Sequence, residues 1–313
     1  MAFHFKRKES PTKALRRLSR ERIGKALDYL RQCDRLEAIH NVRKEIKKVR
    51  ATFGLVRGQM GENAYHKRVK TLRAAAKRLQ DPRDARVRPQ ALERLTVHFQ
   101  NRLPARAFVG IKKVLNQNCR AEVREFRKDQ SLVVVGRLLR KMNRRAGDLK
   151  VKADGWTAIR RGLQESYSQG RKAYEKAREE TSPKNLHQWR KQVQNLWHQL
   201  RLLRSIQPEN LRAAVGEMKI LSQYLGDDHD LVMLRRFVGR QCGRRHAREV
   251  KQLNQLIELR QKELRSAAFA LGSRFYVEKP PSFCRRLENY WHLWHAGKDA
   301  RVERASKLRT ICR

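Results

Sequence analysis

The sequence predicts an all-α fold, because three kinds of pattern agree. Apolar residues recur at helical spacing along almost the whole chain, and the one β-like run, residues 132–135, is too short to outweigh its helical flanks. Most of the eight prolines and 16 glycines lie where helices are expected to begin or end. One helical pattern also occurs twice along the chain. We therefore expect two stacked helical bundles related by an internal duplication.

Proline, glycine and aspartate residues divide the first half into six expected helices. Ser10 and Pro11 can supply an N-cap and a first helical residue, and Asp34 can cap the second helix. Pro82 and Pro104 restart the chain after breaks. The expected helices cover about residues 11–33, 34–58, 63–79, 81–98, 104–126 and 131–145.

The second half repeats this order. Ser182 and Pro183 open the second of its helices. Gly226 and the two aspartates after it are expected to end the third helix, so that a short helix follows from His229. The expected helices cover about residues 154–180, a segment from 183, 208–225, a short segment from 229, 246–271 and a segment from 280. The aromatic residues of the last helix are assigned to hydrophobic packing.

Two helices in this order have the same amphipathic pattern. In residues 39–53, apolar side chains form one stripe, and five basic side chains lie together on the neighbouring face, within an arc of roughly 120°. Residues 186–200 repeat the apolar stripe and begin the basic face again. The basic side chains are His40, Arg43, Lys44, Lys47 and Arg50 in the first helix, and His187, Arg190 and Lys191 in the second, where His187 follows His40 by 147 residues.

A second pair of segments supports the duplication. Residues 72–84 align with residues 218–230 at an offset of 146, with matching apolar positions and an aspartate that closes each segment. Two separate matches in the same order indicate an internal repeat. We expect a first helical half over residues 1–148, a second over residues 149–297 and a basic C-terminal tail over residues 298–313.

The charge of the chain indicates a polyanionic partner. The 313 residues include 75 Lys and Arg against 31 Asp and Glu, which gives a formal net charge of +44. Such an excess is costly to keep compact, and 40% hydrophobic residues in helical patterns argue against a disordered basic chain. Nucleic acid, an anionic membrane surface or a polyphosphate would each satisfy this charge. No apolar run approaches the roughly 20 residues of a membrane span, so we expect no membrane partner.

Several classes of site find no support in the sequence. The five cysteines are widely spaced and form no CxxC pair, which fits a reducing cytoplasm and provides neither a zinc nor a disulfide framework. The first charged residues are not followed by an apolar segment, so we expect no secretory signal. His292 and His295 have metal-ligand spacing but no carboxylate pair or cysteine nearby, so we expect no metal and no cofactor. Because nucleotide-binding loops and carboxylate clusters are also missing, we expect no enzymatic activity.

The paired motifs carry a family resemblance. The helix pattern His-x-x-Arg-Lys, followed by a turn that closes with Asp, appears in both halves and resembles the CHAD family of histidine-bearing α-helical domains over about residues 10–297. The resemblance implies two pseudo-symmetric antiparallel four-helix bundles with peripheral helices, which meet at a basic cleft that binds inorganic polyphosphate. His40, Arg43, Lys47 and Arg50 match the first motif, and His187, Arg190 and Lys191 match the second. Gln194 and Trp197 depart from it, so we expect the second half to contribute less.

The chemistry of these residues suits a phosphate chain. Such a chain carries repeated charge and no base edges, so it needs a dense array of cations, which residues 40–50 present along about 15 Å of helix. We expect Asp84 and Asp230 to orient neighbouring cations rather than to act as catalytic acids. The candidate polyphosphate-binding residues are His40, Arg43, Lys44, Lys47, Arg50, His66, Lys70, Arg73, Lys77, Arg83, Arg137, Arg140, Lys141, Arg144, His187, Arg190, Lys191, Arg201 and Lys219.

Alternative interpretations stay open at this point. A basic helix face is often only solvated surface. This alternative to a binding site is strongest for the basic residues of 66–77 and 137–144. Nucleic acid is the second candidate partner, although the best basic stripe has no aromatic residues among its cations for base stacking. The first candidate function is non-catalytic binding of inorganic polyphosphate, with the protein located on polyphosphate granules in the cytoplasm. The oligomeric state is not predicted.

Overall fold

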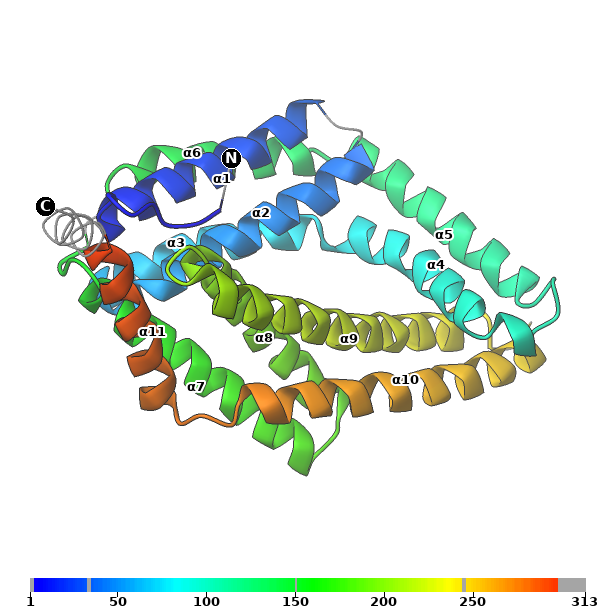
Figure 1. The fold of residues 1–313 in the computed structure, drawn as a ribbon. Helices are drawn as coiled ribbons and strands as arrows, with labels where there is room; N and C mark the ends of the chain where they lie inside the picture. The colour runs from blue at the N-terminus through cyan, green and yellow to red at the C-terminus, as the bar shows by residue number, and fades with distance from the viewer. Residues whose placement is uncertain (1–2, 33–34, 150, 244–245, 298–313) are drawn as a thin grey trace, which may run out of the picture.

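The chain folds entirely into helices over the residues that the structure describes. The computed structural model describes residues 3–32, 35–149, 151–243 and 246–297, and it contains no strand within these ranges, which confirms the all-α prediction (Figure 1). The helices of the first half are α1 (Pro11–Gln32), α2 (Arg35–Leu55), α3 (Glu62–Arg78), α4 (Gln80–His98), α5 (Val109–Lys128) and α6 (Ser131–Ala146), with the short 3₁₀ helices η1 (Arg57–Gln59) and η2 (Gln100–Arg102). Those of the second half are α7 (Thr157–Glu179), α8 (Pro183–Leu203), α9 (Pro208–Gln241), α10 (Ala247–Phe275) and α11 (Pro280–Ala296).

Most helices begin where the sequence predicts. The hydroxyl of Ser182 accepts a hydrogen bond from the backbone N–H of Asn185 (3.3 Å), and Pro183 follows at the first helical position. Proline suits that position because its missing N–H would have no partner inside the helix. Asp34, the expected cap of the second helix, and the tail 298–313 lie outside the described residues.

The break predicted at Gly226 is wrong, because α9 runs through it without interruption. In the first half the equivalent chain is divided at Leu79, shortly before Pro82, whose ring clashes with the preceding helical turn. The second half has Asp228 at the equivalent position, and this residue keeps its backbone N–H. A glycine in a helix costs only about 1 kcal/mol relative to alanine. The carboxylate of Asp228 also accepts bonds from Arg265 (2.7 Å) and Gln261 (3.1 Å) of α10, which hold this part of α9 in place.

Three hydrophobic clusters hold the helices together. One joins the C-terminal part of α1 to α2, α3 and α6. Another joins α7 and α8 to α11 and the N-terminal part of α9. The third joins α4 and α5 of the first half to α10 and the C-terminal part of α9. Figure 1 shows α4 and α5 alongside the far ends of α9 and α10, so this cluster combines elements from both halves of the sequence.

The two helices that carry the repeated pattern, α2 and α8, pack against each other. The side-chain amide of Gln199 donates to the backbone carbonyl of Ala51 (3.3 Å) across this contact. Gly162 brings α7 close to the end of α2, since a Cβ there would lie 2.1 Å from the carbonyl oxygen of Leu55. The apolar stripe of α2, at most 1% exposed, consists of Ile39, Val42, Ile46, Val49 and Phe53. Burial of these stripes directs the neighbouring polar faces toward one another.

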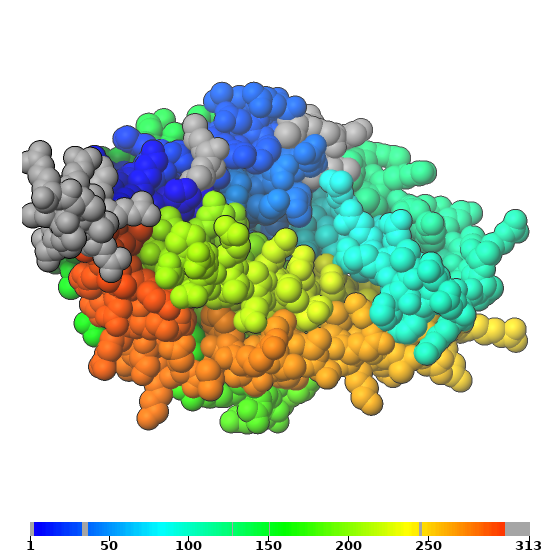
Figure 2. Space-filling model, viewed as in Figure 1, coloured from blue at the N-terminus to red at the C-terminus, as the bar shows by residue number. Residues whose placement is uncertain are grey.

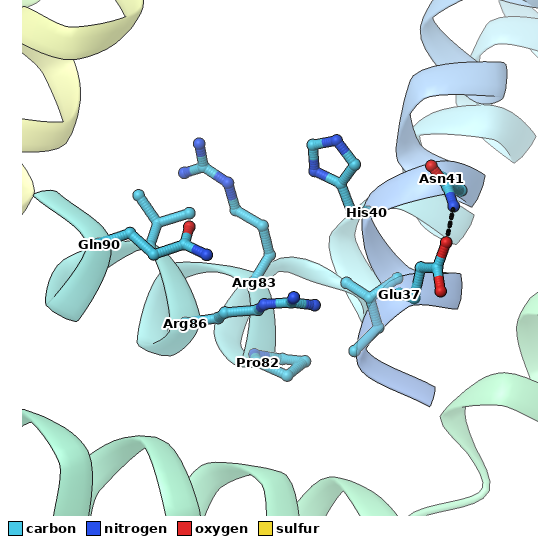
Figure 3. A pocket seen from close by; sticks show the side chains of 9 residues that line it. Glu37, His40, Asn41, Pro82, Arg83, Arg86 and Gln90 are labelled. Atoms are coloured by element: carbon cyan, nitrogen blue, oxygen red, sulfur yellow. Dashed lines mark hydrogen bonds between the residues drawn. The ribbon is translucent and has the colours of Figure 1, made fainter. Parts of the chain in front are cut away.

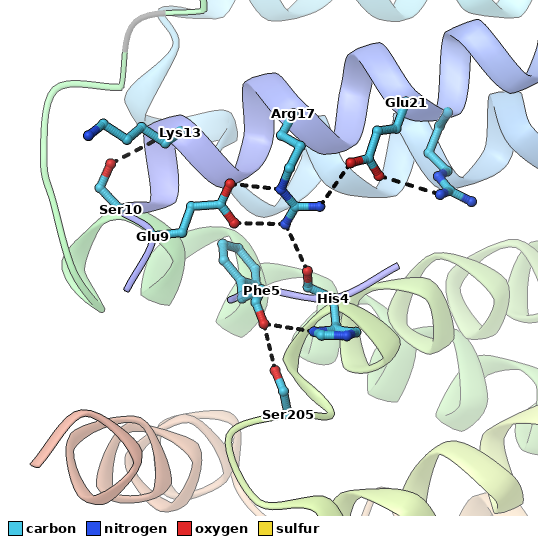
Figure 4. Close-up of polar contacts among 9 residues, drawn as sticks. His4, Phe5, Glu9, Ser10, Lys13, Arg17, Glu21 and Ser205 are labelled. Atoms are coloured by element: carbon cyan, nitrogen blue, oxygen red, sulfur yellow. Dashed lines mark hydrogen bonds and ion pairs between the residues drawn. The ribbon is translucent and has the colours of Figure 1, made fainter. Parts of the chain in front are cut away.

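The N-terminal segment forms hydrogen bonds with residues of both halves (Figure 4). Arg17 donates to the carboxylate of Glu9 (2.7 and 2.8 Å) and to the backbone carbonyl of His4 (3.1 Å). The carbonyl of Phe5 accepts a bond from the hydroxyl of Ser205 (2.9 Å), just after α8. These contacts place the ring of Phe3 at the edge of the His198 ring, with 6.4 Å between their centroids.

Both halves also contribute to one face of the molecule. In the space-filling view, the surface of α9 lies between that of the blue helices α1 and α2 and that of the orange α10 (Figure 2). Among the helices in the described ranges, none is both long and apolar enough to cross a membrane.

Candidate functional site

A cavity of about 570 Å³ lies between the two halves, and we call it the basic cleft. Its walls come from α2, α3, α4, α8 and α9. The lining residues are Arg43, Lys47, Arg50, Arg73, Ala76, Lys77, Gln80, Arg83, Asp84, His187, Arg190, Lys191, Gln194, Asn195, His198, His229 and Met233. Eight are arginine or lysine, three are histidine and one is a carboxylate, so the cleft concentrates positive charge.

The basic cleft collects nine of the candidate residues from the sequence. They come from four helices that are distant in sequence: α2, α3, α4 and α8. The nine are Arg43, Lys47, Arg50, Arg73, Lys77, Arg83, His187, Arg190 and Lys191.

His40 lies in a smaller neighbouring cavity of about 270 Å³. Figure 3 shows its ring beside the side chain of Arg83, with Arg86 below them. Arg83 lines both cavities, so it lies at the boundary between them. Partial burial, together with the charges of Lys44 and other cations, lowers the pKa of His40. His40 and His187 therefore lie at adjoining cavities rather than in one.

The other candidate cations do not line the basic cleft. His66 pairs with Glu62 (2.9 Å) on the exposed side of α3. The guanidinium of Arg201 lies over the rings of Trp197 (5.1 Å) and Phe3 (5.6 Å). The remaining candidates, all solvent-exposed, are Lys44, Lys70, Arg137, Arg140, Lys141, Arg144 and Lys219.

The two repeat-related aspartates hold Arg83 between them. Its Nη1 donates to Asp84 (2.8 Å) and its Nη2 donates to Asp230 (3.2 Å). Asp230 also accepts a bond from Arg94 (3.2 Å). Burial raises the pKa of the Asp230 carboxyl, but the neighbouring His229 ring, with its Nδ1 3.7 Å away, and the charge of Arg83 outweigh it and lower the pKa overall. These contacts show both aspartates orienting neighbouring cations, as expected from the sequence.

A pair of stacked histidines forms part of the second-half wall. The rings of His187 and His229 lie with centroids 4.7 Å apart and an interplanar angle of 27°. Burial, followed by the charges of His229, Lys191 and Arg190, lowers the pKa of His187 to about 4. Sequence reasoning did not select His229, although the repeat alignment places it at the position of Arg83.

Lys47 lies partly buried among arginines. Burial is the main cause that lowers the pKa of its amine to about 7, and the charges of Arg190, Arg43, Arg83 and Arg50 lower it further. Arg43 is held by a bond from its Nη1 to the backbone carbonyl of Ala76 (2.5 Å). No hydrogen bond or ion pair to Lys47 occurs within the part of the chain that the structure describes.

Several buried side-chain nitrogens in the basic cleft have no hydrogen-bond partner among the described residues. They include Nε of Arg50, Nε of Arg190 and Nδ1 of His187. Buried polar atoms are seldom left unpaired, and each such group calls for a water, an ion or a ligand. The two guanidinium donors without a partner, Nε of Arg50 and Nε of Arg190, suit a bound anion with many oxygens.

His198 and Gln194 are further cleft residues that sequence reasoning did not select. His198 is 5% exposed, and burial, with nearby Arg201 and Lys47, lowers its pKa well below the ordinary value. His198 follows His187 by 11 residues, which places the two side chains within about 20° of one another around α8, so helical phase is the signal that could have selected it. Gln194 occupies the position that Lys47 has in the first copy. No group of three metal-ligating side chains occurs within the described ranges.

Comparisons with known proteins agree with this architecture. A family model of the CHAD domain matches residues 13–239. The crystal structure of the CHAD domain from the plant Ricinus communis is similar to this chain, with a TM-score of 0.65 and 16% sequence identity. That match covers 88% of this chain and 95% of the other. At this identity the similarity shows the fold alone. No curated protein matches the sequence.

Proposed function

This chain belongs to the CHAD domain family, and we propose that it binds inorganic polyphosphate in the basic cleft without catalysing a reaction on it. The observation that carries the proposal is the convergence of eight arginine and lysine side chains from both halves on one cavity, against a single lining carboxylate. That carboxylate, Asp84, already accepts a bond from Arg83.

The arrangement of donors fits a chain of phosphates. Arginine can bridge two oxygens with its planar fork, and lysine supplies a point charge. The unpaired Nε atoms of Arg50 and Arg190 come from α2 and α8, so a single anion chain between these helices would satisfy donors of both halves. The cations are carried on rigid helices, which reduces the conformational entropy that binding must cost.

The lining also argues against catalysis and against base recognition. No serine, threonine, cysteine or tyrosine lines the described cleft, and its one acid is occupied by Arg83. No tryptophan, tyrosine or phenylalanine lines it either, whereas single-stranded nucleic acids are usually held by aromatic stacking. Nucleic acid is therefore proposed only as a weaker competing polyanion. Location on cytoplasmic polyphosphate granules would follow from the same binding.

A competition experiment tests this function. Labelled long-chain polyphosphate is bound to the full chain at fixed salt and challenged with unlabelled polyphosphate, single-stranded DNA, RNA or inorganic phosphate at equal charge concentration. We expect unlabelled polyphosphate to displace the label at least tenfold more effectively than either nucleic acid, which corresponds to a difference of about 1.4 kcal/mol in binding free energy. Equal displacement by nucleic acid would replace the proposal with general polyanion binding.

A further inference from the structure

Lys47 differs from the other lysines of the basic cleft. Lys77 and Lys191 line the same cavity but are exposed, whereas Lys47 is partly buried between α2 and α8. It has no hydrogen bond or ion pair to another described residue. Its Nζ is thus the one lysine amine of the cleft that is withdrawn from bulk solvent and yet borders an open cavity.

Three helices present a cation or a histidine to Lys47. Arg43 and Arg50 belong to its own helix, Arg83 comes from α4 and Arg190 comes from α8. His198 of α8 also lies near. With a pKa of about 7, the amine is largely neutral at pH 7.5. An ordinary lysine, with a pKa of about 10.4, is neutral in only about one molecule in a thousand.

We propose that Lys47 is an acylation site that reacts with small acyl phosphates. Arginine forks bind the phosphate of such a molecule, which brings its acyl carbon beside a neutral amine. The Nζ lone pair forms a C–N bond to the acyl carbon, and the bond from that carbon to the phosphate oxygen breaks. Phosphate leaves with the electron pair and takes up the amine proton, so the products are an amide and hydrogen phosphate. The inference rests on the proposed capacity of the cleft to bind phosphate groups.

Acylation would also change the cleft as a receptor. The amide cannot take up a proton when an anion binds, so the modified cleft would have seven rather than eight arginine and lysine side chains able to carry charge, and the Lys47 side chain would be longer by an acyl group. Both effects weaken binding of a phosphate chain. The modification would therefore link the supply of acyl phosphates to occupancy of the cleft.

The test measures acetylation at individual lysines. The full chain is incubated with acetyl phosphate at pH 7.5, and the initial rates at Lys47, Lys77 and Lys191 are compared by peptide mass spectrometry. A less basic amine is also a weaker nucleophile, as is known for thiols. We therefore expect Lys47 to be acetylated about tenfold faster than Lys77 and Lys191, which is less than the full ratio of their neutral fractions. Saturating pyrophosphate should abolish the faster acetylation of Lys47. With N-hydroxysuccinimide acetate, which carries no phosphate, the ratio of the Lys47 rate to the other two rates should be smaller.

Three results would overturn the inference. The first is acetylation of Lys47 that is no faster than that of Lys77 and Lys191, and the second is no protection by pyrophosphate. The third is a rate ratio with the phosphate-free reagent equal to that with acetyl phosphate. Lys47→Arg, which removes the amine but keeps a basic side chain, should lose the fast site, and the measurements on the unsubstituted chain remain decisive if this variant does not fold. Polyphosphate affinity is measured on the same unmodified sample. Tight binding of the polymer without faster acetylation of Lys47 would refute only the acylation site. Faster acetylation of Lys47 that pyrophosphate suppresses, in a chain that does not bind the polymer, would refute only the proposed function.

Discussion

Arg83 of the first half donates a hydrogen bond to Asp230 of the second half, with 3.2 Å between its Nη2 and the carboxylate oxygen. The same guanidinium bonds Asp84, and the two aspartates occupy equivalent positions of the internal repeat. One arginine therefore connects the closing aspartates of both repeats. This contact fixes α4 against α9 along one wall of the basic cleft.

Removing the acidic group of Asp230 should weaken polyanion binding. Asp230→Asn keeps the shape of the side chain but loses the charge that holds Arg83 and Arg94. We expect about a fivefold to tenfold loss of polyphosphate affinity, since a misplaced arginine forfeits charge-assisted bonds. Affinity is measured by titration at fixed salt.

The sign of this effect distinguishes positioning from bulk attraction. If only net charge mattered, loss of an acid beside the cleft would strengthen binding. The matched control is Glu125→Gln on the exposed surface of α5, where the acid pairs only with Lys128 among the described residues. A gain of affinity in Asp230→Asn would contradict the role assigned to this carboxylate.

Binding should depend on pH in two windows. A bound phosphate chain favours the charged forms of Lys47 and His187, so binding takes up protons wherever these groups are neutral in the free protein. Lys47, with a free pKa of about 7, should strengthen binding as the pH falls from about 9 to 7. His187, with a free pKa of about 4, should add to this as the pH falls from about 6.5 toward 4.

Two substitutions separate the windows. Lys47→Arg should flatten the upper window, because arginine stays charged throughout. His187→Gln should flatten the lower one and leave the upper one in place. Titrations of polyphosphate at constant ionic strength provide the measurement. A response that is flat in the unsubstituted protein would remove both residues from the contact set.

Gly162 should be needed for the packing of α7 against α2. Gly162→Ala would place a methyl group 2.1 Å from the carbonyl oxygen of Leu55, where neither backbone can give way cheaply. We expect a loss of about 1–3 kcal/mol in the free energy of unfolding. Gly216→Ala in α9 is the control, since nothing lies within 4 Å of its added Cβ, and it should gain up to about 1 kcal/mol. Chemical denaturation measures both, and equal effects would contradict the close approach.

The sequence predicts helix boundaries well where a nearby residue causes them. Pro11 and Pro183 begin helices because proline is suited to the first helical position. The failure at Gly226 is informative, because that segment lacks a proline and Asp228 is held by Arg265 of a distant helix. A contact between α9 and α10 decides the outcome, and no local pattern reports it.

The candidate site was predictable in part for the same reason. The basic faces of α2 and α8 follow from helical phase, which is why Arg43, Lys47, Arg50, His187 and Arg190 are found in the cleft. His198 shares the helical phase of His187 and could have been found in the same way, whereas His229 enters the cleft only because α9 packs against α8. The basic face of α6 shows the converse, since helical phase alone could not tell that its cations would lie outside the cleft.

The most direct test of the account compares two pairs of arginines by polyphosphate affinity and its salt dependence. Arg43→Gln with Arg50→Gln removes two charges from the cleft, and Arg137→Gln with Arg140→Gln removes two from the exposed face of α6. Circular dichroism of both variants serves as the control for folding. We predict that the cleft pair lowers affinity about a hundredfold and that the α6 pair lowers it less than about threefold. Equal losses would show that binding follows total charge and would contradict a site in the basic cleft.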